Sequence, residues 1–157
     1  MKNLIPIVIL FFISCSKDNN SVTKNSTVIE NYIDIRLKDL NGNNIFNNST
    51  YTFSSMSVKY LVNGSVISPP YAGTQPILLD DVTFLPYGVR IFLNNTETEE
   101  YPLTYIKWNS TDTDTIKAHF NRGNSNGQDY EILDKVWINN NIVTSYIEPG
   151  HYVNLVK

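Results

Sequence analysis

Residues 103–138 read LTYIKWNSTDTDTIKAHFNRGNSNGQDYEILDKVWI, and this stretch decides the fold. It contains three runs rich in β-branched and aromatic residues, at 103–108, 115–120 and 130–138. Such runs favour β-strands, because branched and aromatic side chains pack well on a pleated surface. Residues 121–127, between the last two runs, are asparagine, glycine and serine around one arginine. That composition predicts a mobile hairpin loop between two strands.

The same kind of pattern extends toward the N-terminus. Residues 32–38 and 56–62 alternate apolar and polar side chains with a period of two, which indicates half-buried strands. Asn63-Gly64 follows the second run, and both residues accept the positive φ that a type I′ turn requires. We therefore predict a hairpin in which residues 65–67 form the partner strand.

Further strands are predicted at 77–79, 89–93 and 152–156, and residues 39–43 (DLNGN) predict a turn whose returning strand begins at Ile45-Phe46. No segment offers twelve residues with helical apolar spacing and caps. Seven to nine short strands separated by turn residues indicate a sandwich or a barrel. The predicted class is all-β, a single antiparallel β-sandwich domain covering residues 28–157.

The N-terminus has the features of a targeting signal. Lys2 precedes an apolar run of ten residues, Leu4 to Ile13, about half of the roughly 20 residues that a membrane-spanning helix needs. Such a run is typical of a secretory signal peptide, here residues 1–14. Phe12-Ile13-Ser14-Cys15 resembles a bacterial lipobox, which implies that Cys15 is acylated with palmitate-type chains. The alternative is that Cys15 is a buried thiol within a cleaved signal.

Residues 15–27 (CSKDNNSVTKNST) are small, polar and aperiodic, so we interpret them as the lipidated cysteine and a flexible tether. Ser16 rather than Asp follows the cysteine, which resembles the pattern of lipoproteins sorted to the outer membrane. Ser16-Lys17-Asp18 resembles the short export tag of surface lipoproteins. The expected location is the outer membrane, with the surface and the periplasmic face both open.

Composition narrows the partners. The formal net charge is −3, and it becomes −4 without the signal, whose charged side chain is Lys2. Lysine and arginine are scattered without a basic stripe, so nucleic acid is not an expected partner. Nothing in the sequence implies a cofactor.

Three segments carry a family resemblance: DLNGNN at 39–44, YLVNGS at 60–65, and DTDTIKAHF with KVWINNN between 112 and 141. They are similar to segments of small, uncharacterised bacterial outer-membrane lipoproteins with immunoglobulin-like or transthyretin-like sandwich domains. The resemblance implies a fold and an address. It supplies no catalytic residue.

The sequence offers few of the residue combinations that are typical of active sites. The histidines are His119, expected to be exposed on its strand, and His151 after a Pro-Gly turn. No G-x-S-x-G nucleophile elbow occurs, and an acylated Cys15 cannot act as a thiol nucleophile. Carboxylates cluster at Asp80-Asp81 and at 97–100, where solvated loops are the simpler interpretation. We therefore predict that the protein is not an enzyme.

Calcium is a more plausible ligand of the acidic residues. Asp112 and Asp114 lie in NSTDTD at 109–114, which supplies the oxygen ligands that calcium prefers. Residues 39–43 supply similar oxygens, although a hairpin turn explains them. Zinc lacks its usual cysteine and histidine set.

Aromatic residues offer the best candidate ligand surface. Tyr71, Trp108 and Trp137 could stack on a sugar ring while neighbouring asparagines and aspartates bind its hydroxyl groups. The alternative is that both tryptophans belong to the sandwich core, where most large aromatic side chains lie.

These observations favour a membrane-anchored lipoprotein that acts as a non-catalytic binding or interaction module, for glycan or for an envelope partner. The alternative is a structural accessory of an outer-membrane complex at the periplasmic face. An enzyme that uses clustered acids is the third hypothesis.

Overall fold

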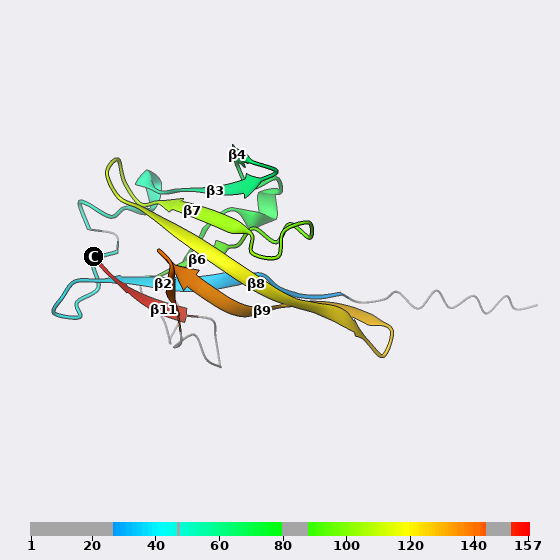
Figure 1. Cartoon of the computed structure of the whole chain (residues 1–157). Helices are drawn as coiled ribbons and strands as arrows, with labels where there is room; N and C mark the ends of the chain where they lie inside the picture. Colours follow the sequence, from blue (N-terminus) through cyan, green and yellow to red (C-terminus); the bar gives the residue numbers. More distant parts are fainter. Residues whose placement is uncertain (1–26, 47, 80–87, 144–151) are drawn as a thin grey trace, which may run out of the picture.

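A computed structural model describes residues 27–46, 48–79, 88–143 and 152–157, and it consists of two packed β-sheets (Figure 1). The all-β prediction is confirmed, although the described residues form eleven strands, more than predicted. The strands are β1 (Val28–Glu30), β2 (Tyr32–Lys38), β3 (Ser57–Val62), β4 (Ser65–Ile67), β5 (Ile77–Leu79), β6 (Gly88–Phe92), β7 (Leu103–Lys107), β8 (Thr113–Ser125), β9 (Gln128–Ile138), β10 (Asn141–Ile142) and β11 (Tyr152–Val156). Two short 3₁₀ helices cover Phe53–Ser55 and Ala72–Thr74.

The larger sheet has seven strands in the order β1-β9-β8-β7-β3-β4, with β10 also paired to β9. The smaller sheet has four, in the order β11-β2-β6-β5. The predicted antiparallel sandwich is wrong in one respect: β1 runs parallel to β9, and β11 runs parallel to β2. Alternation along a strand reveals which face is buried, but it says nothing about the direction of the neighbouring strand.

The core lies between the sheets. The inward residues of β2 predicted from alternation are Ile33, Ile35 and Leu37, and each is at most 1% exposed. They face the larger sheet, which contributes buried Ile106, Ile116 and Val136 among others. Each such side chain stabilises the fold by about 1.5–3 kcal/mol through loss of contact with water.

The hairpin formed by β8 and β9 differs from its prediction. Residues 121–125 belong to β8, and the turn is only Asn126-Gly127, with φ angles of 53° and 80°. The paired ends of the two strands project beyond the rest of the sheet (Figure 1). Polar residues suit this segment because both of its faces meet water, so a run that looked like a loop is a strand.

Other turns follow their sequence signals. Asn63 and Gly64 have φ angles of 49° and 75°, as the predicted type I′ turn requires. The Asp39 carboxylate accepts hydrogen bonds from the backbone N–H groups of Asn41 and Asn43, each at 2.8 Å, and so closes the predicted turn. The expected returning strand at Ile45-Phe46 is absent from the described residues, where a single bridge joins Lys38 to Asn44.

Several sequence predictions lie outside the described residues: the signal peptide, Cys15, nearly all of the tether, Asp80-Asp81 and His151. In the part of the chain that is described, no helix has the length and apolar character needed to span a membrane.

Candidate ligand-binding face

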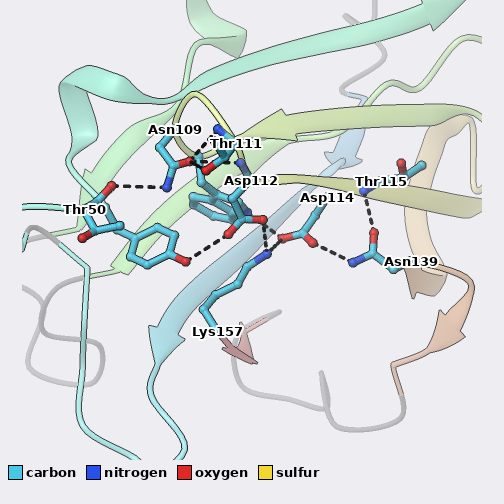
Figure 2. Close-up of polar contacts among 10 residues, drawn as sticks. Thr50, Asn109, Thr111, Asp112, Asp114, Thr115, Asn139 and Lys157 are labelled. Atoms are coloured by element: carbon cyan, nitrogen blue, oxygen red, sulfur yellow. Dashed lines mark hydrogen bonds and ion pairs between the residues drawn. The ribbon is translucent and has the colours of Figure 1, made fainter.

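Asp112 and Asp114, the candidate calcium ligands, are brought together near the start of β8, but they converge on a lysine (Figure 2). Lys157 Nζ lies 2.8 Å from Asp112 Oδ1 and 2.6 Å from Asp114 Oδ2. The Asp114 side chain is 3% exposed and the Lys157 side chain 11%. The three residues form a largely buried ion cluster.

The polar partners of Asp114 shape its pKa. Burial raises the pKa of Asp114, but the hydrogen bonds donated by Lys157, Asn139 and Trp108 outweigh it and leave the pKa below its usual value. Burial lowers the pKa of Lys157, and the hydrogen bonds to Asp112 and Asp114 outweigh that effect, so its pKa lies above its usual value. Asp114 and Lys157 are therefore both charged at neutral pH.

This geometry explains the two aspartates without calcium. A cation between two carboxylates already exists in the form of the Lys157 ammonium. Throughout the described ranges, no group of three or more histidine, cysteine, aspartate or glutamate side chains is arranged to hold a metal ion. The cluster is suited to joining the segment after β11 to β8.

Trp108 is part of the core, so its proposed role in ligand stacking is wrong. It is 1% exposed, and its Nε1 donates to Asp114 Oδ2 at 2.6 Å. Its ring packs edge-on against Phe46, with centroids 6.4 Å apart. A buried tryptophan usually finds a partner for its N–H, and Asp114 supplies one here.

One asparagine holds the loop before β8, and a second holds the start of β8 itself. Asn109 Oδ1 accepts from the backbone N–H of Thr111 at 2.9 Å and of Asp112 at 3.0 Å (Figure 2). Asn139 donates to Asp114 Oδ1 at 2.6 Å and accepts from the Thr115 N–H. Asn139 and Lys157 are distant in sequence from Asp114, so only the fold reveals the set.

Trp137 has a different position. It lies on the face of β9 that points away from the smaller sheet, and it is only half-buried. Tyr101, 43% exposed, meets it edge-on with ring centroids 5.8 Å apart. The ammonium of Lys117 lies 4.5 Å from the centroid of Trp137 and 5.7 Å from that of Tyr101. A cation at such distances is attracted to the ring faces.

His119 extends this group. Its ring centroid lies 5.6 Å from that of Tyr101, and its Nδ1 lies 2.9 Å from Asp134 Oδ2. Asp134 is the extra residue of a bulge in β9, where the pairing shifts between His119 and Phe120. His119 was expected to be exposed; its side chain is 28% exposed, because Tyr101 lies beside it.

Register places further residues on the same surface. Strand alternation directs Lys59 of β3, Tyr105 and Lys107 of β7, and Lys135 of β9 away from the core. The name aromatic–lysine face is used below for the outward-facing set Lys59, Tyr101, Tyr105, Lys107, Lys117, His119, Lys135 and Trp137. Trp137 was a candidate from the sequence, but Tyr101 and Lys117 were not. Lys117 is the cross-strand partner of Trp137, and Tyr101 meets its ring from the segment before β7.

Tyr71 is not part of this face. It is 72% exposed and lines a cavity of about 350 Å³ together with Tyr60, Thr74 and Asn95 among others. A second cavity of about 520 Å³ shares Asn95 and Glu97 with the first and is lined also by Arg122 and Glu131. Arg122 donates to Glu131 Oε2 at 2.7 Å and to the Asn95 carbonyl, so these charges are paired within the wall.

Fold and surface together define a two-sheet β-protein with an exposed aromatic and basic face on its larger sheet. Comparisons with protein-family models, with curated proteins and with solved structures find no match to this chain.

Proposed function

We propose that the protein is a membrane-anchored lipoprotein whose β-domain is a non-catalytic binding module, with glycan as the first candidate ligand. The observation that carries the proposal is the contact set of Lys117 with the rings of Trp137 and Tyr101 on an outward face. Flat rings offer stacking area for a sugar, while lysine and histidine side chains supply hydrogen-bond donors beside them.

The proposed anchor is lipid on Cys15, which would attach the domain to the bacterial outer membrane through the tether of residues 15–27. A single acyl chain gives only marginal membrane binding, so a multiply acylated cysteine fits a stable anchor better. The resemblance to small outer-membrane lipoproteins supports this location. It also supports the finer assignment of an immunoglobulin-like or transthyretin-like sandwich, which we retain as part of the proposal.

The binding test uses the full chain, purified from membranes in detergent and passed over a panel of immobilised polysaccharides. Trp137→Ala combined with Tyr101→Ala should weaken retention at least tenfold, because both stacking rings are lost. Tyr152→Ala is the matched control, since it removes an exposed aromatic from the smaller sheet. Circular dichroism checks that each variant is folded. Equal retention of the double variant would overturn the proposed site.

Adding protease to intact cells tests on which side of the outer membrane the domain lies. A periplasmic protein is the control for the integrity of the cells. Cleavage of the domain with an intact control supports capture of ligands at the cell surface. Protection of both proteins rejects surface display and points to a periplasmic partner.

A second candidate function is a structural accessory of an outer-membrane complex. It is favoured by β4, an edge strand of the larger sheet whose residues are all exposed, including Val66 at 59% and Ile67 at 38%. An exposed apolar edge can accept a strand from another protein. Chemical crosslinking in cells, compared between the native chain and Val66→Lys, tests this: loss of a crosslinked partner in the variant supports it, and an unchanged pattern rejects it.

A further inference from the structure

Positive charge is concentrated on one surface of an acidic chain. The formal net charge is −3, yet four neighbouring strands of the larger sheet, β9, β8, β7 and β3, each direct one lysine outward. Those lysines are Lys135, Lys117, Lys107 and Lys59. Lys59, Lys107 and Lys135 are exposed, whereas Lys117 is half-buried between aromatic rings.

The strand register arranges these lysines on the face as two diagonal pairs. Lys135 pairs with His119, which lies two residues along β8 from Lys117. Lys117 in turn pairs with Leu103, and Lys59 pairs with Tyr105, two residues further along β7. Diagonal neighbours in a sheet are about 7–8 Å apart. Lys135 and Lys117 are therefore diagonal neighbours, and so are Lys59 and Lys107, whereas Lys117 and Lys107 are four residues out of register. The lysine band is thus two such pairs spread over four strands, with the rings of Trp137, Tyr101 and Tyr105 beside it.

Two lysines of the band contact neutral groups, whereas Lys135 forms a long ion pair with Asp134. The Glu100 carboxylate is hydrogen-bonded to Tyr101 on the same face. Lys117 lies against rings, and Lys59 Nζ donates to Ser68 Oγ at 2.8 Å. The carboxylate of Asp134 is closest to His119, at 2.9 Å, and is 3.8 Å from Lys135 Nζ. An approaching anion would thus meet ammonium groups beside flat rings.

We propose that the aromatic–lysine face binds an acidic polysaccharide, with its sugar rings against Trp137 and Tyr101 and its carboxylates at Lys117 and Lys135. This inference rests on the proposed function and specifies its ligand class. A neutral glycan would use the lysines only as hydrogen-bond donors and would leave their positive charge without a counterpart. A membrane surface fits less well, because Trp137 and Lys117 are half-buried in the sheet rather than projecting from it.

The test compares two polymers that have the same rings and differ in charge: polygalacturonate and its fully methyl-esterified form. The full chain in detergent is titrated with each at 50 mM and at 500 mM NaCl. We expect polygalacturonate to bind at least tenfold more tightly at low salt, and the advantage to fall at high salt because screening weakens ion pairs at exposed sites.

Substitutions in the lysine band test whether these lysines cause the preference for polygalacturonate. Lys117→Met with Lys135→Met should lower affinity for polygalacturonate at least tenfold, and arginine at both positions should restore most of it. Lys38→Met, on the smaller sheet, is the matched control and should bind like the native chain. A denaturation curve for each variant separates loss of charge from loss of fold.

Each outcome decides between the two proposals. Equal binding of both polymers would overturn the acidic ligand while supporting the glycan-binding function. Binding of neither would overturn the acidic ligand, and the polysaccharide panel then tests the function by itself. Equal binding of a single-stranded oligonucleotide, with the same loss in the double lysine variant, would replace the proposal with unselective binding of polyanions.

Discussion

The ammonium nitrogen of Lys157 lies 2.6 Å from Oδ2 of Asp114, so the residue following β11 is tied to a residue near the start of β8. Trp108 donates to the same carboxylate oxygen at 2.6 Å. A salt bridge and a core tryptophan thus depend on one carboxylate, and the contact joins the smaller sheet to the larger one.

Lys157→Met should therefore destabilise the fold. The substitution leaves Asp114, whose side chain is 3% exposed, without its cationic partner. Breaking a buried pair in this way costs about 3 kcal/mol. Urea denaturation at pH 7 measures the loss. Lys135→Met is the control, because Lys135 is 56% exposed and its ion pair with Asp134 is long, at 3.8 Å. A similar loss of stability in this variant would contradict the special role of Lys157.

Acid should weaken the same contact. The pKa of Asp114 lies below its usual value of 3.8, despite burial, because of its hydrogen bonds to Lys157, Asn139 and Trp108. A carboxylate with a lowered pKa stabilises the fold above its unfolded pKa and loses that contribution as the pH falls through its folded pKa. Asp114→Asn should therefore be about 2 kcal/mol less stable than the native chain at pH 7, with a smaller difference at pH 3. A constant difference in urea denaturation would refute this.

Alkali should act through Tyr60. Burial raises the pKa of this tyrosine from 10.0 to about 12, although a hydrogen bond with Thr74 works in the opposite direction. Because this pKa is raised in the folded state, neutral Tyr60 contributes its full stabilisation below pH 10 and loses it as the pH rises through about 12. The free energy of unfolding should be about 2 kcal/mol lower at pH 12 for this reason. Tyr60→Phe also loses the hydrogen bond to the Phe92 carbonyl, but its stability should fall less between pH 9 and pH 12. Chemical denaturation at both pH values measures the change.

The hairpin turn depends on glycine. Gly127 has a φ of 80°, so Gly127→Ala should cost about 1–2 kcal/mol, because a side chain is strained in the left-handed region. Gly73→Ala is the control, since a Cβ there meets nothing within 4 Å and its φ is not in that region. Thermal melts of the two variants should separate them, and equal melting temperatures would argue against strain at residue 127.

The proposed lipid anchor is tested at Cys15. We expect cells that express the full chain to incorporate labelled palmitate into it, and Cys15→Ala to abolish the label. Partition into detergent should be lost in the same variant. Labelling of Cys15→Ala at the native level would contradict lipidation at this residue.

Local signals in the sequence predict much of this fold. Asn63-Gly64 predicts its hairpin because both residues tolerate positive φ, and the alternation at 32–38 predicts the buried face of β2. Long-range pairing is not visible in such patterns. The parallel partners of β1 and β11 are specified by how the two sheets close, and no local periodicity encodes them.

The candidate site shows the same contrast between local signals, which the sequence reveals, and long-range contacts, which it does not. The sequence left Trp137 open between the core and a ligand-binding surface, and the fold places it outward beside Lys117, its cross-strand partner. Trp108 had no such signal and lies in the core. Asp112 and Asp114 were recognisable in the sequence as a cluster of oxygen ligands. Their cation comes from Lys157, which follows β11 and is distant from them in sequence.

The parallel pairing of β11 with β2 also sets a condition on folding kinetics. It joins Tyr152 to Asp34 and Val156 to Lys38, residues from opposite ends of the described chain. Contacts between residues far apart in sequence slow folding, because the entropy of closing the loop is lost before the contact is gained. Until residues 152–156 are in place, one edge of β2 therefore stays unpaired and the smaller sheet is incomplete.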